Sequence, residues 1–184
     1  MGGLEHAPAT VTIRPARPDD VPAVVAMVHE LAAYEEAPEQ CHLSDDQLSV
    51  ALFGSDPALF CHVAVGADDT AVGFSLWFLN FSTWEGTHGV YVEDLYVRPA
   101  ARTAGAGRAL LSAMAAICLE RGYRRLEWWV LDTEALAPSR AFYRRIGGTE
   151  LREWVPWRVE GAALARLAGS RRDDTAAPSN AGRP

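Results

Sequence analysis

One short stretch of the chain contains two features that could bind a ligand or take part in a reaction. Residues 90–111, VYVEDLYVRPAARTAGAGRALL, carry adjacent carboxylates, Glu93 and Asp94, followed by a turn rich in glycine and alanine. A turn of this kind at a helix start offers free backbone N–H groups and the positive end of the helix dipole to an anion. Carboxylates accept protons or hold cations. The stretch therefore combines a possible phosphate site with an acidic site.

The turn RTAGAGR occupies residues 102–108. Gly105 and Gly107 allow positive φ or close approach of the backbone to a ligand, and Arg102 and Arg108 add guanidinium donors suited to phosphate oxygens. A tight strand-to-helix connection with surface arginines explains the turn alone equally well. No GxGxxG or GxxxxGK pattern occurs, which disfavours a dinucleotide or nucleoside triphosphate site.

The two carboxylates are expected to act separately. Residues 90–97 alternate as a strand, and successive side chains of a strand point to opposite faces of the sheet. Glu93 and Asp94 are therefore not expected to form a coupled pair. One of them should face a cleft, and the other should leave it.

Composition excludes several classes of function. The chain has 184 residues and a formal net charge of −7, with 24 acidic against 17 basic residues, which argues against nucleic-acid binding. It has no lysine, so phosphate-loop and Schiff-base lysines are excluded. Cysteines and histidines show no metal-ligand spacing, so no metal is expected. The scattered cysteines, the missing signal peptide and the missing membrane-length apolar run predict a cytoplasmic protein without membrane contact.

The periodicity predicts the order β-α-α-β-β-β-α-β-α-β-α. Helix ends are marked by Asp19 or Asp20 as an N-cap, by the capping box from Ser44 to Gln47, and by Gly122 as a C-terminal stop. The expected strands are 11–16, 60–65, 71–79, 90–97, 124–131 and 149–159, and the expected helices are about 20–34, 44–53, 106–121, 138–148 and 160–168. Residues 80–89 read as a loop.

The fold class is α/β, with a mixed sheet flanked by helices. The strand-helix-strand passage over residues 90–131 predicts a parallel pair with a right-handed crossover inside an otherwise antiparallel sheet. Residues 10–168 are expected to form one domain. Residues 1–9 and 169–184 are small, polar and proline-containing, and are expected to be disordered tails.

Seven ordered stretches resemble the GNAT superfamily of N-acetyltransferases and, within it, the diamine acetyltransferase family with its thialysine branch. The resemblance covers nearly the whole chain, about residues 11–168. The stretches are IRPARPDD (13–20), ELAAYE (30–35), LWFLNFSTWEG (76–86), YVEDLYVRP (91–99), RTAGAGRALL (102–111), AFYRRIGG (141–148) and EWVPWRVEGAAL (153–164). The fold implied is that of the GNAT acyltransferases, a mostly antiparallel central sheet with a splayed parallel pair.

The resemblance implies acetyl-CoA as cosubstrate. Its diphosphate would lie on the amides of the glycine-rich turn, and its pantetheine arm would pair with the strand edge that follows Asp94. Ser139, near a helix start, is a further contact. The residues assigned to the cosubstrate are thus Leu95, Tyr96, Val97, Arg102, Thr103, Ala104, Gly105, Ala106, Gly107, Arg108 and Ser139.

The resemblance also assigns catalytic roles. Acetyl transfer to an amine needs a neutral amine, a donor for the oxyanion and a proton for the departing thiolate. Tyr143 is placed as the general acid, with its neighbour Phe142 in the core. Glu93 is placed as base and amine anchor, acting directly or through water, while an edge carboxylate paired with arginine is the alternative. Asp94 supports it.

Besides Glu93, acceptor contacts are implied at Tyr34 and Glu35, which end the first long helix, and at Trp84, in the loop before the strand 90–97. A solvated acidic helix end explains the first two nearly as well, and a packing role explains Trp84 as well. Three features depart from the family pattern. Residues 131–139 lack the usual asparagine, Thr103 replaces a usual glycine, and Ser82 stands where the polyamine enzyme has a carboxylate. The last change favours a shorter or zwitterionic amine.

The sequence thus predicts an N-acetyltransferase that moves acetyl from acetyl-CoA to a primary amine of a small molecule, a polyamine or a thialysine-like amine. The amine attacks directly in a ternary complex, since no suitably paired cysteine nucleophile is present. The resemblance implies a homodimer. Two alternatives stay open: another acceptor on the same fold (an amino acid, an aminoglycoside or a protein N-terminus), and a non-catalytic CoA-binding module. The sequence does not identify the acceptor.

Overall fold

The computed structural model describes residues 11–169. The chain divides into two compact units, with the boundary between Ile146 and Gly147. This boundary falls inside the single domain expected over residues 10–168, which stays a prediction. The expected tails, 1–9 and 169–184, lie outside the described residues except for Gly169, which ends a helix.

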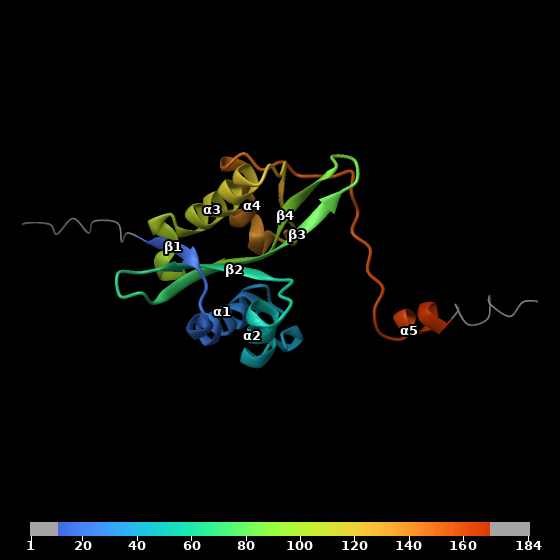
Figure 1. The fold of residues 1–184 in the computed structure, drawn as a ribbon, viewed down its shortest axis with the longest axis horizontal. Helices are drawn as coiled ribbons and strands as arrows, with labels where there is room; N and C mark the ends of the chain where they lie inside the picture. Colours follow the sequence, from blue (N-terminus) through green and yellow to red (C-terminus); the bar gives the residue numbers. More distant parts are fainter. Residues whose placement is uncertain (1–10, 170–184) are drawn as a thin grey trace, which may run out of the picture. The chain divides into compact units, whose positions relative to one another are not determined.

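The first unit is built on a five-stranded sheet of order β1-β2-β3-β4-β5 (Figure 1). Neighbouring strands pair antiparallel except β4 and β5, which are parallel, so the predicted mixed sheet is confirmed. The strands are β1 Thr12–Pro15, β2 Phe60–Val65, β3 Ala71–Ser82, β4 Thr87–Val97 and β5 Leu126–Trp128. The helices are α1 Val21–Tyr34, α2 Asp45–Phe53, α3 Ala106–Glu120 and α4 Ala137–Arg145, with short 3-10 turns at Pro18–Asp20, Pro38–Gln40, Pro99–Ala104 and Glu134–Leu136.

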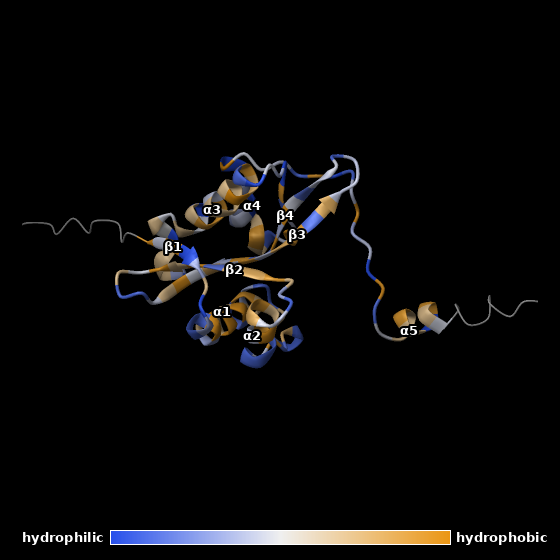
Figure 2. Ribbon diagram, viewed as in Figure 1, coloured by the Kyte–Doolittle hydropathy of each residue, from blue (hydrophilic) through white to orange (hydrophobic). Residues whose placement is uncertain are grey.

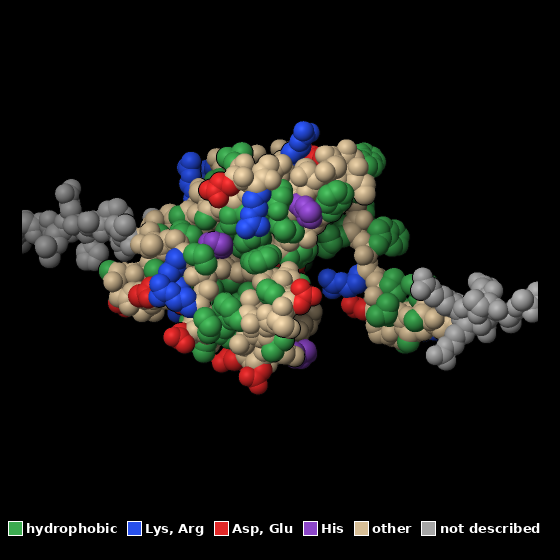
Figure 3. Space-filling model, in the orientation of Figure 1, with side chains coloured by type: hydrophobic (Ala, Val, Ile, Leu, Met, Phe, Trp, Pro, Cys, Tyr) green, Lys and Arg blue, Asp and Glu red, His purple; other side chains and the backbone are tan. Residues whose placement is uncertain are grey.

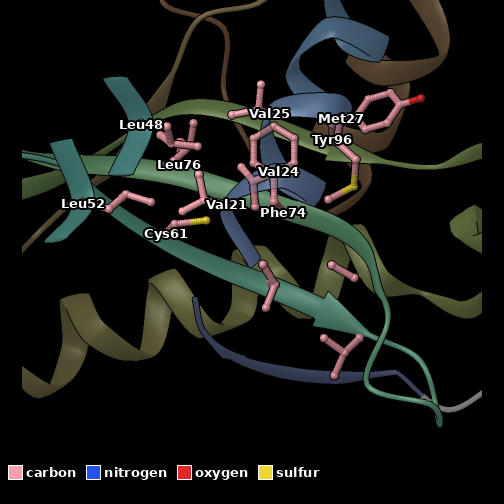
Figure 4. Packing of buried hydrophobic residues seen from close by; sticks show 13 residues of the cluster. Val21, Val24, Val25, Met27, Leu48, Leu52, Cys61, Phe74, Leu76 and Tyr96 are labelled. Atoms are coloured by element: carbon pink, nitrogen blue, oxygen red, sulfur yellow. The ribbon is translucent and has the colours of Figure 1, made fainter. Parts of the chain in front are cut away.

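Helices cover both faces of this sheet. In Figure 1, α1 and α2 lie on one side, and α3 and α4 lie on the other. On the α1 side, Val24 and Met27 are fully buried against Phe74 of β3 (Figure 4). On the α3 side, Met114 packs with Val90. Figure 2 shows hydrophobic residues concentrated along the strands, while the turn between β2 and β3 is hydrophilic. The sheet is therefore a rigid platform with a core on each face.

Most helix ends follow the local signals in the sequence. The Ser44–Gln47 capping box is present in both directions, and Gly122 adopts φ +70 just after α3. The start of α1 differs from the prediction. Asp20 precedes α1 but its side chain makes no capping bond; it accepts hydrogen bonds from Arg14 at 2.7 Å and from the Arg17 amide at 2.7 Å. The carboxylate instead ties β1 to the turn that leads into α1.

The expected loop over residues 80–89 is wrong in most of its length, because β3 and β4 continue to Ser82 and from Thr87 as a long hairpin. Its polar side chains form hydrogen bonds with side chains at β5 and directly before it. Asn80 donates to Glu127 at 2.8 Å, and Arg125 donates to Asn80 at 2.9 Å and to Glu85 at 3.1 Å. A stretch that looked like a loop by polarity is a polar network beside β5, which itself is shorter than the expected 124–131.

The second unit is described by itself over residues 147–169. Its element is helix α5, Gly161–Gly169, which agrees with the expected terminal helix. The expected strand over 149–159 is wrong, since these residues form no strand. A strand needs a neighbour for its N–H and C=O groups, and no strand is found within residues 147–169. Trp154 and Trp157 are 67% and 92% exposed there. Within residues 11–169, no helix has the length and apolar character needed to span a membrane.

Candidate active site

Strand β4 contains a bulge at the two adjacent carboxylates. Trp77 of β3 faces Val92, but the next residue back, Leu76, faces Asp94. Glu93 is therefore the extra residue, with no partner on β3. A bulge of this kind bends the strand and re-aims side chains, and bulges are frequent beside active sites.

The bulge places Glu93 and Asp94 on the same face of the sheet. Val92 packs into the core on the α3 side, and Leu95 returns to that side three residues later, whereas strict alternation requires two or four. The two residues between them lie toward α1. The expectation that the carboxylates point to opposite faces is therefore wrong. They are also electrically coupled, because the charge of Glu93 raises the pKa of Asp94.

Three carboxylates and a phenol from three elements form one electrostatic cluster. Burial raises the pKa of Asp94 to about 6, with further contributions from the charges of Glu93 and Glu35. Burial also raises the pKa of Tyr143, on α4, to about 12, with the charge of Glu35 adding to it. Glu35, at the end of α1, has a pKa raised by partial desolvation, although its side chain stays largely open to solvent. Glu35 thus lies near both Asp94 and Tyr143.

The raised pKa of Asp94 predicts a pH-dependent stability. Folding raises this pKa from 3.8 to about 6, so the folded chain binds more protons than the unfolded chain between these values. The contribution of Asp94 to the free energy of unfolding therefore falls as pH rises from about 4 to about 6, and stays lowered above. We expect Asp94→Asn to unfold like the parent near pH 4 but to be more stable by about 1–3 kcal/mol above pH 6.5, since one pKa unit corresponds to about 1.4 kcal/mol.

Urea unfolding followed by circular dichroism at pH 4 and pH 7 measures this difference. The matched control is Asp56→Asn, which changes an exposed carboxylate in the loop after α2. Equal stability of Asp94→Asn and the parent at pH 7 would show that Asp94 ionises without cost.

A cavity of about 300 Å³ lies beside Glu35. One wall is the end of α1, and the other is the segment from Thr133 to Leu136 that leads into α4. The Tyr34 hydroxyl lies 3.5 Å from the Ala135 carbonyl oxygen and so links the two walls. The cavity adjoins the carboxylate cluster through Glu35, which lines it.

Tyr143 and Phe142 lie side by side on α4. Tyr143 packs on Trp128 of β5, with ring centroids 5.0 Å apart. Phe142 packs against the start of α3, where a Cβ added to Gly107 would lie 3.7 Å from its ring. Both rings contact the α3-side core, and the charge of Glu35 contributes to the raised pKa of Tyr143.

The end of β4 presents a free backbone edge. β5 pairs only with Val90–Val92, so the residues after Glu93 have no neighbour on that side among those described. The Arg98 amide donates to the Val72 carbonyl at 2.9 Å, which directs the polar backbone groups of Arg98 and Tyr96 toward β3. By alternation, the backbone groups of Leu95 and Val97 face the free edge. An extended ligand arm can pair there.

The glycine-rich turn follows directly. Residues Pro99–Ala104 form a 3-10 turn, Gly105 adopts φ +75, and α3 begins at Ala106. A Cβ added to Gly105 would meet no atom within 4 Å, so the space beside the turn is open. Arg108, in the first turn of α3, is exposed and has no ionic partner among the described residues. The unpaired amides at the start of α3 and an open arginine together fit a diphosphate.

Arg102 is differently placed. Its Nε donates to the Val97 carbonyl oxygen at 2.9 Å. Its guanidinium carbon lies 5.0 Å from the ring centroid of Tyr34 and 5.8 Å from that of Tyr96. The side chain therefore connects the turn to α1 and β4.

Two assigned residues lie apart from this cluster or show no contact with it. Trp84 is 91% exposed in the β3–β4 turn. Ser139 is half-buried in the first turn of α4, and no contact joins it to the glycine-rich turn. Sequence reasoning gave Asp94 only a supporting role and missed the wall formed by residues 133–136. Burial and the nearby charges of Glu93 and Glu35 raise the pKa of Asp94, and the sequence of β4 alone contains no signal for this arrangement.

Other features of the described residues do not compete with this site. A cavity of about 320 Å³ lies at the start of β2, between α2 and α3, and is lined by His62 and Trp77 among others. None of the assigned residues lines it. Within residues 11–169, no cluster of three or more histidine, cysteine, aspartate or glutamate side chains is arranged to hold a metal ion.

Known proteins resemble the chain at both the sequence and the structural level. Residues 24–148 match the acetyltransferase (GNAT) family. A thialysine N-epsilon-acetyltransferase of Sus scrofa is 33% identical over 171 residues, covering 88% of this chain and 99% of that protein. An L-ornithine N5-acetyltransferase of Arabidopsis thaliana is 27% identical, covering 84% and 86%.

Among solved structures, an integron cassette protein from the mobile metagenome of V. cholerae superposes with a TM-score of 0.71 at 26% identity, covering 86% of this chain and 98% of that one. The splayed end of β4, the glycine-rich turn before α3 and the family match over most of the first unit agree with one another. The chain is an acetyltransferase and belongs to the GNAT family.

Proposed function

We propose that the protein transfers acetyl from acetyl-CoA to the primary amine of a small molecule, a thialysine-like amine or a polyamine, by direct attack in a ternary complex. The observation that supports it most is the continuity of β4. One strand leads from the carboxylate cluster through a free backbone edge into the glycine-rich turn. A phosphate-binding turn and an amine-binding cluster are thereby held at opposite ends of a few residues of rigid backbone.

The chain's own residues fit acetyl-CoA. Acetyl-CoA, when bound, supplies an activated acetyl group. The amides from Thr103 to Arg108 would hold its diphosphate, together with the exposed Arg108 guanidinium. The outward-facing backbone groups of Leu95 and the outward-facing N–H of Val97 would pair with its pantetheine arm, while the Val97 carbonyl oxygen accepts from Arg102. An N–H of the same edge would stabilise the oxyanion.

The acceptor side supplies proton transfer. A free alkylammonium, with a pKa near ~10, has no lone pair and must lose a proton before it attacks. Asp94 and Glu93 would take this proton, directly or through water, with the partly buried Asp94, whose pKa is raised, as the base and the exposed Glu93 as the cation anchor. Tyr143, kept protonated by its raised pKa, would donate a proton to the departing thiolate.

The acceptor is proposed from charge and from the named relatives. Figure 3 shows acidic side chains over the part of the surface formed by α1 and α2, and the net charge of −7 steers cations toward the protein. Ser82 offers a hydroxyl that accepts from the Glu85 amide at 3.2 Å and adds no charge. Two relatives are named for amino-acid acceptors, thialysine and L-ornithine. A zwitterionic amine is therefore the first choice.

Thiol release from acetyl-CoA over an acceptor panel tests the proposal. The panel contains thialysine, ornithine, lysine, putrescine, spermidine, an aminoglycoside and a peptide N-terminus. We expect the highest kcat/KM with thialysine or ornithine. A preference for the peptide or the aminoglycoside would support the alternative acceptors. Tight CoA binding without turnover of any amine would instead indicate a non-catalytic CoA-binding module.

We also propose a homodimer in a reducing, cytoplasmic setting. Exposed apolar side chains of the second unit, Trp154, Val155 and Trp157, offer area that a second copy could cover. Cys41, Cys61 and Cys118 are all free thiols. Sedimentation velocity at micromolar concentration tests the dimer, and a monomer mass would contradict it.

A further inference from the structure

We propose that Arg102 is a positioning residue that couples the cosubstrate turn to the acceptor pocket, rather than a phosphate ligand. Its side chain leaves the turn and lies against Tyr34 and Tyr96. The inference rests on the proposed function, because it takes the turn to bind CoA and the cavity beside Glu35 to bind the amine.

Two kinds of contact hold the Arg102 side chain, which is otherwise exposed. Nε donates to the Val97 carbonyl oxygen at 2.9 Å, on the edge of β4 that faces away from β3. The guanidinium carbon lies within 6 Å of the Tyr34 and Tyr96 ring centroids, at 5.0 and 5.8 Å, which is the range of cation–π attraction. The turn is thus fastened to the strand it follows and to the end of α1.

Arg108 provides the comparison within the same turn. It is exposed, and no acidic or aromatic side chain among the described residues holds it. Both guanidinium groups are candidates for phosphate from the sequence alone. In the structure Arg102 is held through Nε and through two aromatic rings, whereas Arg108 has no such contact among the described residues. Arg108 is therefore the phosphate donor, and Arg102 positions the turn.

One of the two aromatic partners is firmly fixed. Tyr96 is 7% exposed and belongs to the core on the α1 side. Figure 4 shows its ring at the margin of that core, with the hydroxyl pointing outward. Its neighbour Arg98 binds Glu30 of α1 at 2.9 Å and the Ala71 carbonyl at 3.3 Å. Arg102 therefore contacts a ring that is packed in the core and does not belong to the turn.

The other partner is part of the acceptor pocket. Tyr34 ends α1, lines the cavity of about 300 Å³ and reaches toward the Ala135 carbonyl oxygen at 3.5 Å. Its neighbour Glu35 lies in the carboxylate cluster. A shift of Arg102 thus changes the Tyr34 wall, and an amine that fixes this wall fixes Arg102.

The consequence is a mutual effect between the two substrates. CoA that orders the turn also orders Arg102 and Tyr34, so the amine binds a preformed wall. By thermodynamic linkage, the amine raises the affinity for CoA by the same factor. Coupling between sites typically changes affinity by about 5–150-fold, and for this short connection we expect about 5–10-fold.

Calorimetry of CoA binding, with and without saturating thialysine, tests this coupling. CoA has no acetyl group to transfer, so the complex is stable and no turnover is needed. The variants are Arg102→Gln, Tyr34→Leu, their combination, Tyr34→Phe and the matched control Arg108→Gln. Circular dichroism checks that each variant is folded.

We expect thialysine to tighten CoA binding about 5–10-fold in the parent and in Tyr34→Phe, which keeps the ring. Arg102→Gln and Tyr34→Leu should each reduce this factor to below about twofold, and the double variant should lose nothing more. Arg108→Gln should weaken CoA binding but keep the factor.

The proposal is overturned if the parent shows no coupling. It is also overturned if Arg102→Gln behaves like Arg108→Gln, with weaker CoA binding and full coupling. Failure of the proposed function looks different, because then the parent does not bind CoA at all, with or without the amine.

Discussion

Replacing Tyr143 with phenylalanine is expected to lower kcat about 100-fold or more while leaving CoA affinity within about twofold, since general-acid catalysis typically contributes about 10²–10⁴. The variant keeps the ring that packs on Trp128 at 5.0 Å, so the fold should be preserved. Only the hydroxyl is lost. Burial raises its pKa to about 12, so the hydroxyl keeps its proton at neutral pH.

Steady-state thiol release and CoA calorimetry on the same samples measure the two effects. The control is Tyr123→Phe, which removes a hydroxyl from a ring that contacts His88, and its kcat should match the parent. In the parent, activity should not decline through ionisation of Tyr143 below about pH 10. Unchanged turnover of Tyr143→Phe on every acceptor would show that another group protonates the thiolate.

The second large effect is expected at the carboxylate pair. Asp94→Asn should lower kcat/KM for the amine about 100-fold, within the usual range for a general base. In the parent, kcat/KM should rise with pH through about 6 as Asp94 ionises, and this rise should vanish in the variant. Glu93→Gln should act mainly on the KM of the amine, by about 5–10-fold, because one exposed charge is lost and screening by solvent is strong.

pH–rate profiles of both variants, beside Glu39→Gln as an exposed carboxylate in a separate turn, separate these roles. The residue that removes the rise near pH 6 is the base. If Glu93→Gln removes it and Asp94→Asn does not, the role assigned to Glu93 from the sequence is right, and the pKa of Asp94 is of no catalytic consequence.

The architecture was largely predictable because its signals are local. The Ser44–Gln47 box, the stop at Gly122 and the glycine-rich turn before α3 each depend on a few adjacent residues, and each is found where the pattern places it. The parallel β4–β5 pair follows from a helix between two strands. Residue type and short spacing are enough for features of this kind.

The bulge was not predictable in this way. It arises where Leu76 pairs with Asp94 after Trp77 has paired with Val92, and it is therefore a property of two strands together. A shift of one residue moves side chains to the other face of a sheet. Strict alternation along β4 therefore predicted that Glu93 and Asp94 point to opposite faces, although they lie on one face.

Other features could not be predicted from the sequence because they join distant segments of the chain. The stacking of Arg102 on Tyr34 brings together α1 and the turn before α3, and no spacing rule connects them. The hairpin over 80–89 was not predicted because its polar residues have distant partners: Glu127 on β5 and Arg125 directly before it. Residues 149–159 show the reverse error, an alternating pattern that forms no strand, because a strand requires a partner as well as a pattern.

Calorimetric titration of the folded protein with CoA tests the central claim most directly. The roles proposed for the acceptor site all require that the turn from Thr103 to Arg108 binds the nucleotide. We predict one site per chain, with a dissociation constant within the range of about 1 µM to 1 mM common for enzyme substrates. Binding should be clearly weaker in Arg108→Gln. No heat of binding from a parent protein shown to be folded by circular dichroism would contradict the account, whichever amines were tested afterwards.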